Sequence, residues 1–328
     1  MRGKWIALAG AIVVVAGGWT GAWLYARHWL AGQVEPFLTD LERNAGVRLT
    51  CPQREISGWP FRMDLTCLHP TVDMPDGTHV EMARLVGTGV IDDWHLLRFA
   101  VEAPVRVAAP DGSTAVATFS SLVASLRFEK ERLERLSLAG DGLDVEGEVA
   151  GAGRFATAMA HAEAHVRGNP DQPEDADLAA SFKGLTIGRA PDTLLPAPAD
   201  GSADLSLTKV MVAGGDLPSW SAAGGQLLVR DVTLSLGETT FKAVGQGGVD
   251  ADGYPTGSVT LTGHKPEALI ALAKTSGKPL NPAVAGLGTA MLLMGKPVNG
   301  DRQIDLSIAD GGKVSAGAMA LGRVAPLF

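Results

Sequence analysis

A run of 22 residues without a charged side chain, Trp5–Ala26, constrains this chain more than any other feature of its sequence. As an α-helix the run would be about 33 Å long, which matches a bilayer core of roughly 30 Å. Aromatic side chains favour membrane interfaces, and five of them lie at or near the ends of the run: Trp5, Trp19, Trp23, Tyr25 and Trp29. The sequence therefore predicts a membrane-spanning anchor.

A cleavable signal peptide is the alternative interpretation of the same run. The apolar region of a signal peptide spans roughly 7–15 residues and ends in a small-residue cleavage site. The run in this chain is longer, and Thr20-Gly21-Ala22 is its nearest approach to such a site. We expect the uncleaved anchor.

Two basic residues, Arg2 and Lys4, precede the run and predict its orientation. Such residues stay on the cytoplasmic side, so residues 1–28 form a cytoplasmic tail with the anchor, and the rest is exported. Without Arg2, Lys4 and Arg27, 25 of the 28 basic residues remain against 36 acidic residues. This net charge of −11 disfavours binding to nucleic acid and clinging to an anionic lipid surface.

The composition predicts a folded body beyond the anchor. Hydrophobic residues make up 46% of the chain and charged residues 20%, which is too apolar for a disordered chain. Aromatic residues make up 5%, which argues against an aromatic-lined sugar groove or a platform for stacking bases.

The hydrophobic pattern from Val47 onward has a period of two, which is typical of strands with one apolar face. Odd-numbered positions are apolar and even-numbered ones polar in the segment Phe61–Cys67. Similar alternation recurs at 122–128, 205–207, 227–236, 259–261 and 304–308, and Asp-Gly turns lie at 75–77, 110–112, 252–255 and 310–312. We predict a mainly β fold with a long antiparallel sheet after the transmembrane helix.

Helices are expected at both ends of this sheet. Residues 29–46 have apolar positions at helical spacing and predict an exported helical extension, kinked at Pro36. Pro266 and Pro282 open two late helices, which close at Gly277 and Gly295. These two helices should pack on the sheet through a candidate apolar surface: Leu269, Leu272, Val284, Leu287, Met291 and Met294.

Prolines and polar residues gather between 169 and 201 and mark a candidate connecting region. It would separate an N-terminal antiparallel sheet, 47–168, from a C-terminal sheet with the two helices, 202–328. The same prolines also suit loops within one continuous sheet, so one and two domains both remain open.

Cys51 and Cys67 are the only cysteines and are sixteen positions apart. Gly58 and Pro60 favour a turn between them, which would bring two strands and both thiols together. In an oxidising compartment we expect a structural disulfide worth about 3 kcal/mol. Neither cysteine belongs to a C-x-x-C pair, so a metal site is a weak alternative.

The best metal candidate is the group His161, Glu163 and His165. All three share one face of a strand, and the two histidines share one face of a helix. Alternating alanines on the opposite face favour a solvated polar strip instead, so we predict no metal. No P-loop, Rossmann, zinc-protease or serine-hydrolase motif occurs in the chain, and we expect no cofactor and no enzymatic activity.

The segment between the cysteines contains the most specific motif of the chain, Gly58, Trp59, Pro60, Phe61 and Arg62. It resembles the signature of the bacterial DUF2125 family. The anchor, the Gly253–Gly257 segment, the Pro266–Leu269 helix start and the C-terminal Pro326-Leu327-Phe328 also fit that family. The family is distantly similar to AsmA-like envelope proteins, which implies an inner-membrane anchor, a long curved sheet with an apolar inner surface and a role in lipid handling.

The motif has two interpretations, a hairpin corner beside the disulfide and a binding edge near the membrane. If the segment is extended, Trp59 and Phe61 project to opposite sides and Arg62 lies on the polar face.

We expect a protein of the bacterial inner membrane with a cytoplasmic N-terminus and a periplasmic body that binds a lipid or another apolar ligand. The alternative is a structural or assembly factor of the envelope that binds a protein partner through a sheet edge or apolar patch.

Overall fold

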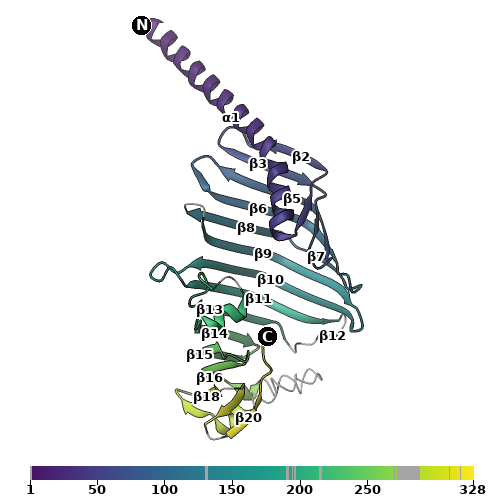
Figure 1. Ribbon diagram of the computed structural model, residues 1–328, viewed down its shortest axis with the longest axis vertical. Coiled ribbons are helices and arrows are strands. Elements are labelled where there is room, and N and C mark those ends of the chain that lie inside the picture. Colours follow the sequence, from purple (N-terminus) through teal and green to yellow (C-terminus); the bar gives the residue numbers. More distant parts are fainter. Residues whose placement is uncertain are drawn as a thin grey trace. The chain divides into compact units, whose positions relative to one another are not determined.

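The computed structural model describes residues 2–129, 132–189, 192–193, 195, 197–213, 216–268, 271, 289–309, 311–317 and 319–328. Most of these residues are in antiparallel strands, and a long apolar helix lies at the N-terminus (Figure 1), which confirms the mainly β fold. The chain divides into two compact units, Met1–Lys130 with Val145–Arg154 (unit 1) and Glu131–Asp144 with Phe155–Phe328 (unit 2).

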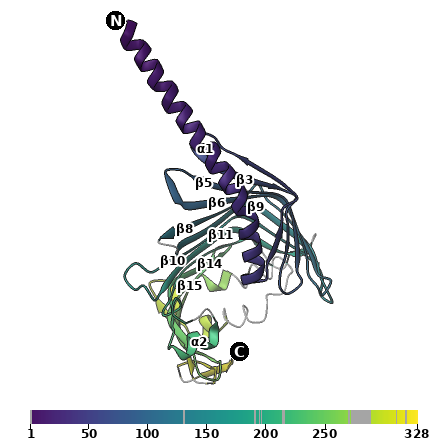
Figure 2. The same ribbon diagram turned by 45° about the horizontal axis from the view of Figure 1, so that its top comes forward.

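Helix α1 (Arg2–Ala45) joins the predicted anchor and the predicted extension in one element. Its N-terminal part is long and apolar enough to cross a membrane, and it projects from the sheet of unit 1 while the C-terminal half lies against that sheet (Figure 2). The helix continues through Pro36. Val34 is buried and Glu35 pairs with Arg54 of the sheet, so packing offsets the hydrogen bond that a proline removes.

The strands of unit 1 follow in the order β2, β3, β5, β6 and β8, with β4 beside β5, β1 beside β4 and β7 beside β6. Their bounds are β1 (Arg48–Thr50), β2 (Gln53–Ser57), β3 (Arg62–Leu68), β4 (Thr71–Asp73), β5 (His79–Val90), β6 (Asp93–Ala108), β7 (Thr114–Thr118) and β8 (Ser121–Glu129). The next strand, β9 (Arg132–Val149), contributes residues to both units.

The predicted alternation gives unit 1 one apolar face. Leu65 pairs with Gly87, which pairs with Phe99, which pairs with Ala124, and all four residues are half-buried. A Cβ atom at Gly87 would lie 3.3 Å from the ring of Phe99, so the glycine leaves room for that ring to cross β5.

The strands of unit 2 form an antiparallel series in the order β10, β11, β13, β14, β15, β16, β18, β19 and β20, with β12 beside β11 and β17 beside β18. Their bounds are β10 (Gly153–Gly168), β11 (Ala176–Arg189), β12 (Asp192–Thr193), β13 (Ala199–Leu207), β14 (Leu227–Leu236), β15 (Thr239–Val249), β16 (Pro255–His264), β17 (Lys296–Val298), β18 (Asp301–Ala309), β19 (Lys313–Ala316) and β20 (Met319–Arg323).

One row of paired residues runs across eight strands of unit 2 and is apolar apart from a glycine. We call it the apolar row: Val166, Leu178, Leu205, Val229, Gly245, Val259, Leu306 and Ala316. Every member is half-buried and none is buried. On the opposite face the neighbouring row is mostly polar, for example Gln246, Ser258, Ser307 and Ser315.

The connecting region predicted at 169–201 is wrong over most of its length. Residues 176–189 are strand β11, and 169–175 form the turn between β10 and β11, where Asn169 N–H donates to Asp175 O at 2.9 Å. The two units divide instead within β9 and near the start of β10. Prolines and polar residues mark a hairpin turn as readily as a linker, which is why composition misplaced the boundary.

The two late helices are described only in part. Residues 266–268 and 289–294 are helical, at the predicted start of the first helix and the predicted end of the second. Gly295 N–H donates to Met291 O at 2.9 Å, so the glycine follows the second helix as expected. A short helix, α2 (Leu217–Ala222), was not predicted, although its cap, Asp216 accepting from Ser219 N–H, is a recognised sequence signal.

Candidate functional site

The family motif forms the turn between β2 and β3. Gly58 has φ +103°, and a Cβ atom there would lie 2.8 Å from the carbonyl oxygen of Arg62. Arg62 N–H donates to Gly58 O at 3.2 Å and closes the turn. Only glycine adopts this conformation without strain and leaves that space, which explains the first residue of the motif.

Trp59 and Phe61 do not project to opposite sides of an extended strand, because the segment is a turn. Both line one cavity of about 580 Å³ in unit 1, together with Trp19, Gly58, Pro60, Arg62, Val90, Ile91 and Asp92. Arg62 forms an ion pair within β3, where its Nε is 2.8 Å from Asp64 Oδ2.

Helix α1 is joined to this turn by two indole groups. Trp19 Nε1 donates to Pro60 O at 2.9 Å, and Trp23 Nε1 donates to Arg62 O at 3.2 Å. The rings of Trp19 and Phe61 also meet, with centroids 6.1 Å apart. Sequence reasoning assigned both tryptophans to a membrane interface and missed these contacts. Trp23 is buried, and a buried indole N–H is expected to find an acceptor.

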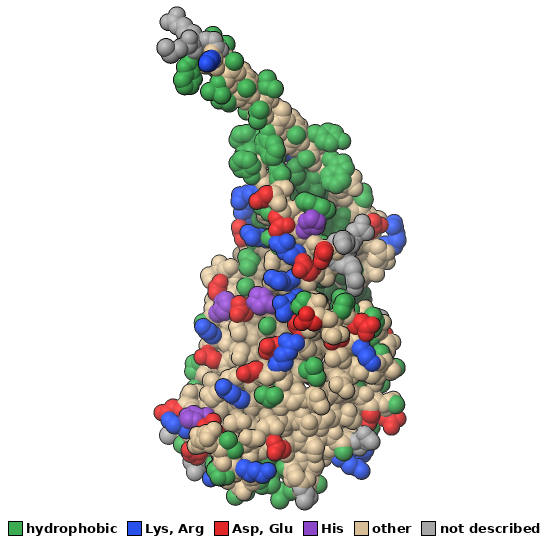
Figure 3. All heavy atoms as spheres, turned by 90° about the vertical axis from the view of Figure 1, so that its left-hand side faces the viewer, with side chains coloured by type: hydrophobic (Ala, Val, Ile, Leu, Met, Phe, Trp, Pro, Cys, Tyr) green, Lys and Arg blue, Asp and Glu red, His purple; other side chains and the backbone are tan. Residues whose placement is uncertain are grey.

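Large apolar side chains are exposed around the cavity. We call Trp59, Phe61, Ile91 and Trp94 the aromatic edge; their exposed fractions run from 43% at Ile91 to 73% at Trp94. Ile91 N–H donates to Phe61 O at 3.1 Å, so the tip of the β5–β6 hairpin is fixed beside the motif turn. In Figure 3 hydrophobic side chains cover the projecting part of α1 and continue to the region where it reaches the sheet.

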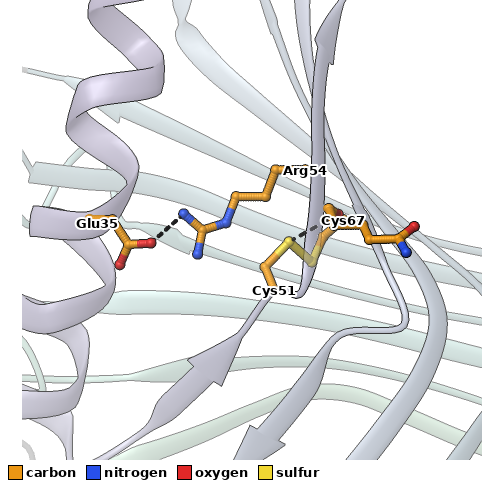
Figure 4. Close-up of a disulfide and its surroundings, with 5 residues drawn as sticks. Glu35, Cys51, Arg54 and Cys67 are labelled. Atoms are coloured by element: carbon orange, nitrogen blue, oxygen red, sulfur yellow. Dashed lines mark hydrogen bonds and ion pairs between the residues drawn. A yellow bond between two sulfur atoms is a disulfide. The ribbon is translucent and has the colours of Figure 1, made fainter.

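The predicted disulfide joins Cys51 and Cys67, whose Cα atoms are 5.6 Å apart. Figure 4 shows it beside the ion pair of Arg54 with Glu35 of α1, whose nitrogen and oxygen are 2.5 Å apart. Arg54 is also the residue of β2 that pairs with Cys67. The disulfide therefore crosslinks the motif hairpin, and the ion pair beside it links the same hairpin to α1.

The metal candidates lie on one face of β10, as the strand interpretation predicts. His161 Nδ1 is 2.7 Å from Asp141 Oδ1, and Glu163 Oε2 is 3.4 Å from His165 Nε2 and 3.8 Å from His161 Nε2. Ser181 donates to the other oxygen of Glu163, and this bond and the histidines lower the pKa of Glu163. Within the described ranges no group of three or more His, Cys, Asp or Glu residues could hold a metal ion.

The candidate apolar surface is described only at Met291 and Met294; Leu269, Leu272, Val284 and Leu287 lie outside the described residues. Met291 is 0% exposed, because it packs on the sheet. Met291 lies against Gly263 of β16. Because glycine has no side chain, the methionine can reach the strand; a Cβ atom at position 263 would lie 2.9 Å from Met291 Cε. Met294 is half-buried.

A buried carboxylate of unit 2, Asp177, was not predicted. It accepts hydrogen bonds from Ser206 Oγ at 2.5 Å, Arg230 Nη2 at 2.8 Å and Asn169 Nδ2 at 3.1 Å, and lies 3.3 Å from Arg167 Nη2. Burial raises the pKa of Asp177, but the hydrogen bonds outweigh burial and the pKa lies below its usual value. The partners are 8 to 53 positions away, so no local sequence pattern reveals them.

We expect unit 2 to lose stability as the pH falls through the lowered pKa of Asp177. A carboxyl with a lowered folded pKa stabilises the fold above its unfolded pKa of about 3.9, and that stabilisation disappears in acid. Asp177→Asn should remove this part of the pH dependence and cost about 1–3 kcal/mol at neutral pH. Urea unfolding of both proteins at neutral pH and in acid measures the effect.

Asp204→Asn is the matched control for this prediction. Asp204 lies 3.3 Å from the same Arg230 but is exposed, so its loss should cost less than about 1 kcal/mol. An unchanged acid dependence in Asp177→Asn would contradict the assigned role of Asp177.

Comparison with known proteins places the chain in a family. No curated protein matches it. The family described as "Uncharacterized protein conserved in bacteria (DUF2125)" matches residues 23–325. The matched range runs from Trp23, whose indole holds the motif turn, to the residues just after β20. The chain therefore belongs to the DUF2125 family, as the motif Gly58–Arg62 predicts.

Proposed function

We propose that this protein is a single-pass, membrane-anchored envelope protein that binds a lipid acyl chain on the apolar face of its sheet. The proposed location is the bacterial inner membrane, with a cytoplasmic N-terminus and a periplasmic body. The apolar length of α1 and the disulfide, which suits an oxidising compartment, support this location. The proposed role is binding without catalysis and without a cofactor, and the AsmA-like similarity stays a prediction.

The apolar row of unit 2 is the observation that carries the proposal. In a domain with a filled core, apolar residues in the middle of a sheet face are fully buried. Here the residues from Val166 to Ala316 that form the row are all half-buried. An acyl chain lying along this row would remove that apolar surface from water, which is favourable by roughly 25 cal/mol per Å².

Native mass spectrometry of the full-length, detergent-extracted protein tests the proposal. We expect bound phospholipid on the wild type. Val259→Gln places a polar group in the apolar row and should weaken binding roughly tenfold, the equivalent of about 1.4 kcal/mol. Ser258→Gln, at the adjacent exposed position on the opposite face, should leave the bound fraction unchanged.

Two results would count against lipid binding. One is the absence of phospholipid from several independent preparations of the wild type. The other is an equal loss of lipid in Val259→Gln and Ser258→Gln, because that would locate the lipid away from the apolar row.

A second candidate function is binding of a protein partner at β20. In the described part of the chain β20 pairs only with β19, and both Met319 and Leu321 are exposed on it. An exposed edge strand with apolar side chains can add a strand from another chain. Site-specific crosslinking from position 321 in cells should then trap one stable partner.

A further inference from the structure

We propose that the aromatic edge inserts into the bilayer interface beside α1, so that unit 1 is seated in the lipid rather than suspended from it. The ligand class is the lipid surface itself, and the contact residues are Trp59, Phe61, Ile91 and Trp94. This inference rests on the proposed membrane anchoring, but it is independent of lipid binding along the apolar row.

The positions of the two indole contacts along α1 carry the inference. Trp19 and Trp23 lie fourteen and eighteen residues after Trp5, which is about 21 Å and 27 Å along a helix. The charge-free run continues to Ala26, so both indoles lie within its last roughly 11 Å. The motif turn accepts hydrogen bonds from both and is therefore held at the depth of the membrane-spanning run.

The surroundings of the two indoles agree with this depth. Tyr25 belongs to the same turns of α1 and is exposed, so the sheet covers only one side of the helix and leaves the rest open to lipid. Arg27 and His28 follow within the next turn, at the level where charged groups reach the head groups.

The side chains around the turn suit an interface. Aromatic residues are enriched where bilayer and water meet, and exposed Trp and Phe side chains next to a membrane helix are costly in water alone. The cation of the turn, Arg62, is paired with Asp64, and Asp64 also accepts from Thr88 Oγ1 at 2.8 Å. The lipid contact is thus apolar and aromatic, and its cation, Arg62, is already paired.

Spin labels on the full-length protein in phosphatidylcholine vesicles test the depth of the aromatic edge. Labels at Phe61→Cys and Ile91→Cys report from the two separate hairpins, since the native cysteines are paired. Thr114→Cys is the aqueous control, because Thr114 is exposed and pairs with Ala108, at the opposite end of β6 from Ile91. Val15→Cys is the reference for a position of α1 in lipid, because Val15 is exposed in the middle of the charge-free run.

We expect dissolved oxygen to relax the labels at 61, 91 and 15 more than a polar nickel complex does, and the order to reverse at 114. If the labels at 61 and 91 behave like the label at 114 while the label at 15 is protected from nickel, membrane anchoring by α1 is supported and the inference is wrong. If the label at 15 is also accessible to nickel, both membrane anchoring and the inference are wrong. Lipid retention by mass spectrometry separately decides the role of the apolar row.

Discussion

Reduction of the Cys51–Cys67 disulfide should lower the free energy of unfolding of unit 1 by about 3 kcal/mol. The disulfide closes a loop with a sequence separation of 16 that contains β2, the motif turn and most of β3. Closing a loop of this size lowers the conformational entropy of the unfolded chain, and the folded state is therefore stabilised relative to it.

The hairpin depends on this link because β2 has little other support. In the described part of the sheet β2 pairs only with β3, over five residues from Gln53 to Ser57. Its links to other parts of unit 1 include the ion pair of Arg54 with Glu35 of α1, which is exposed at Glu35 and worth less than about 1 kcal/mol. We therefore expect the reduced protein to open first at β2 and the motif turn.

Hydrogen exchange of the full-length protein in detergent measures this effect. Amides of β2 should exchange roughly a hundredfold faster after reduction, since each 1.4 kcal/mol is a factor of ten. Amides of β15 and β16 in unit 2 serve as the internal control and should not change. Cys51→Ala with Cys67→Ala should reproduce the reduced state without a reductant, and unchanged exchange at β2 in both experiments would refute the stabilising role.

Features that depend on neighbouring residues were predictable from the sequence. The length of the charge-free run predicts the helix, the period of two predicts the strands, and Gly58 with Pro60 predicts the turn that brings Cys51 to Cys67. Gly295 follows the second late helix, where a Cβ atom would clash with the carbonyl oxygen of Met291. In each case the cause and the effect lie within a few residues of each other.

Features that depend on distant partners were not predictable. An indole at position 19 or 23 suits a membrane interface and a turn carbonyl equally well, and only the fold brings Pro60 to Trp19. Asp177 is satisfied by residues up to 53 positions away. For the same reason the motif was recognisable as a hairpin corner, but its contact with α1 was not recognisable.

Met291→Ala should destabilise unit 2 by about 2–5 kcal/mol, the range for removing most of a fully buried methionine. Met291 is 0% exposed, and its Cε and Sδ atoms lie directly over Gly263 of β16. Arg302 of β18 donates to Gly295 O at 3.1 Å, next to the end of the same helix, so the helix cannot easily shift to fill the cavity. Chemical denaturation followed by fluorescence of Trp220, the tryptophan of unit 2, measures the loss.

The same short helix supplies the matched control. Leu293 is 80% exposed, and Leu293→Ala removes a side chain of similar size from solvent, with an expected change within about 0.5 kcal/mol. Equal losses in the two variants would mean that helix propensity, rather than burial of Met291, holds this segment on the strand.

A double-mutant cycle identifies the surface on which Met291 packs. Gly263→Ala alone should be destabilising, because its Cβ atom would meet Met291 Cε at 2.9 Å and Sδ at 3.0 Å. In the double variant the new methyl group occupies part of the space that the methionine vacates, so the two losses should not add. Strict additivity would show that Met291 does not rest on Gly263. A loss in the double variant that is smaller than the sum of the two single losses would show that Met291 packs against position 263, where glycine leaves room for the methionine.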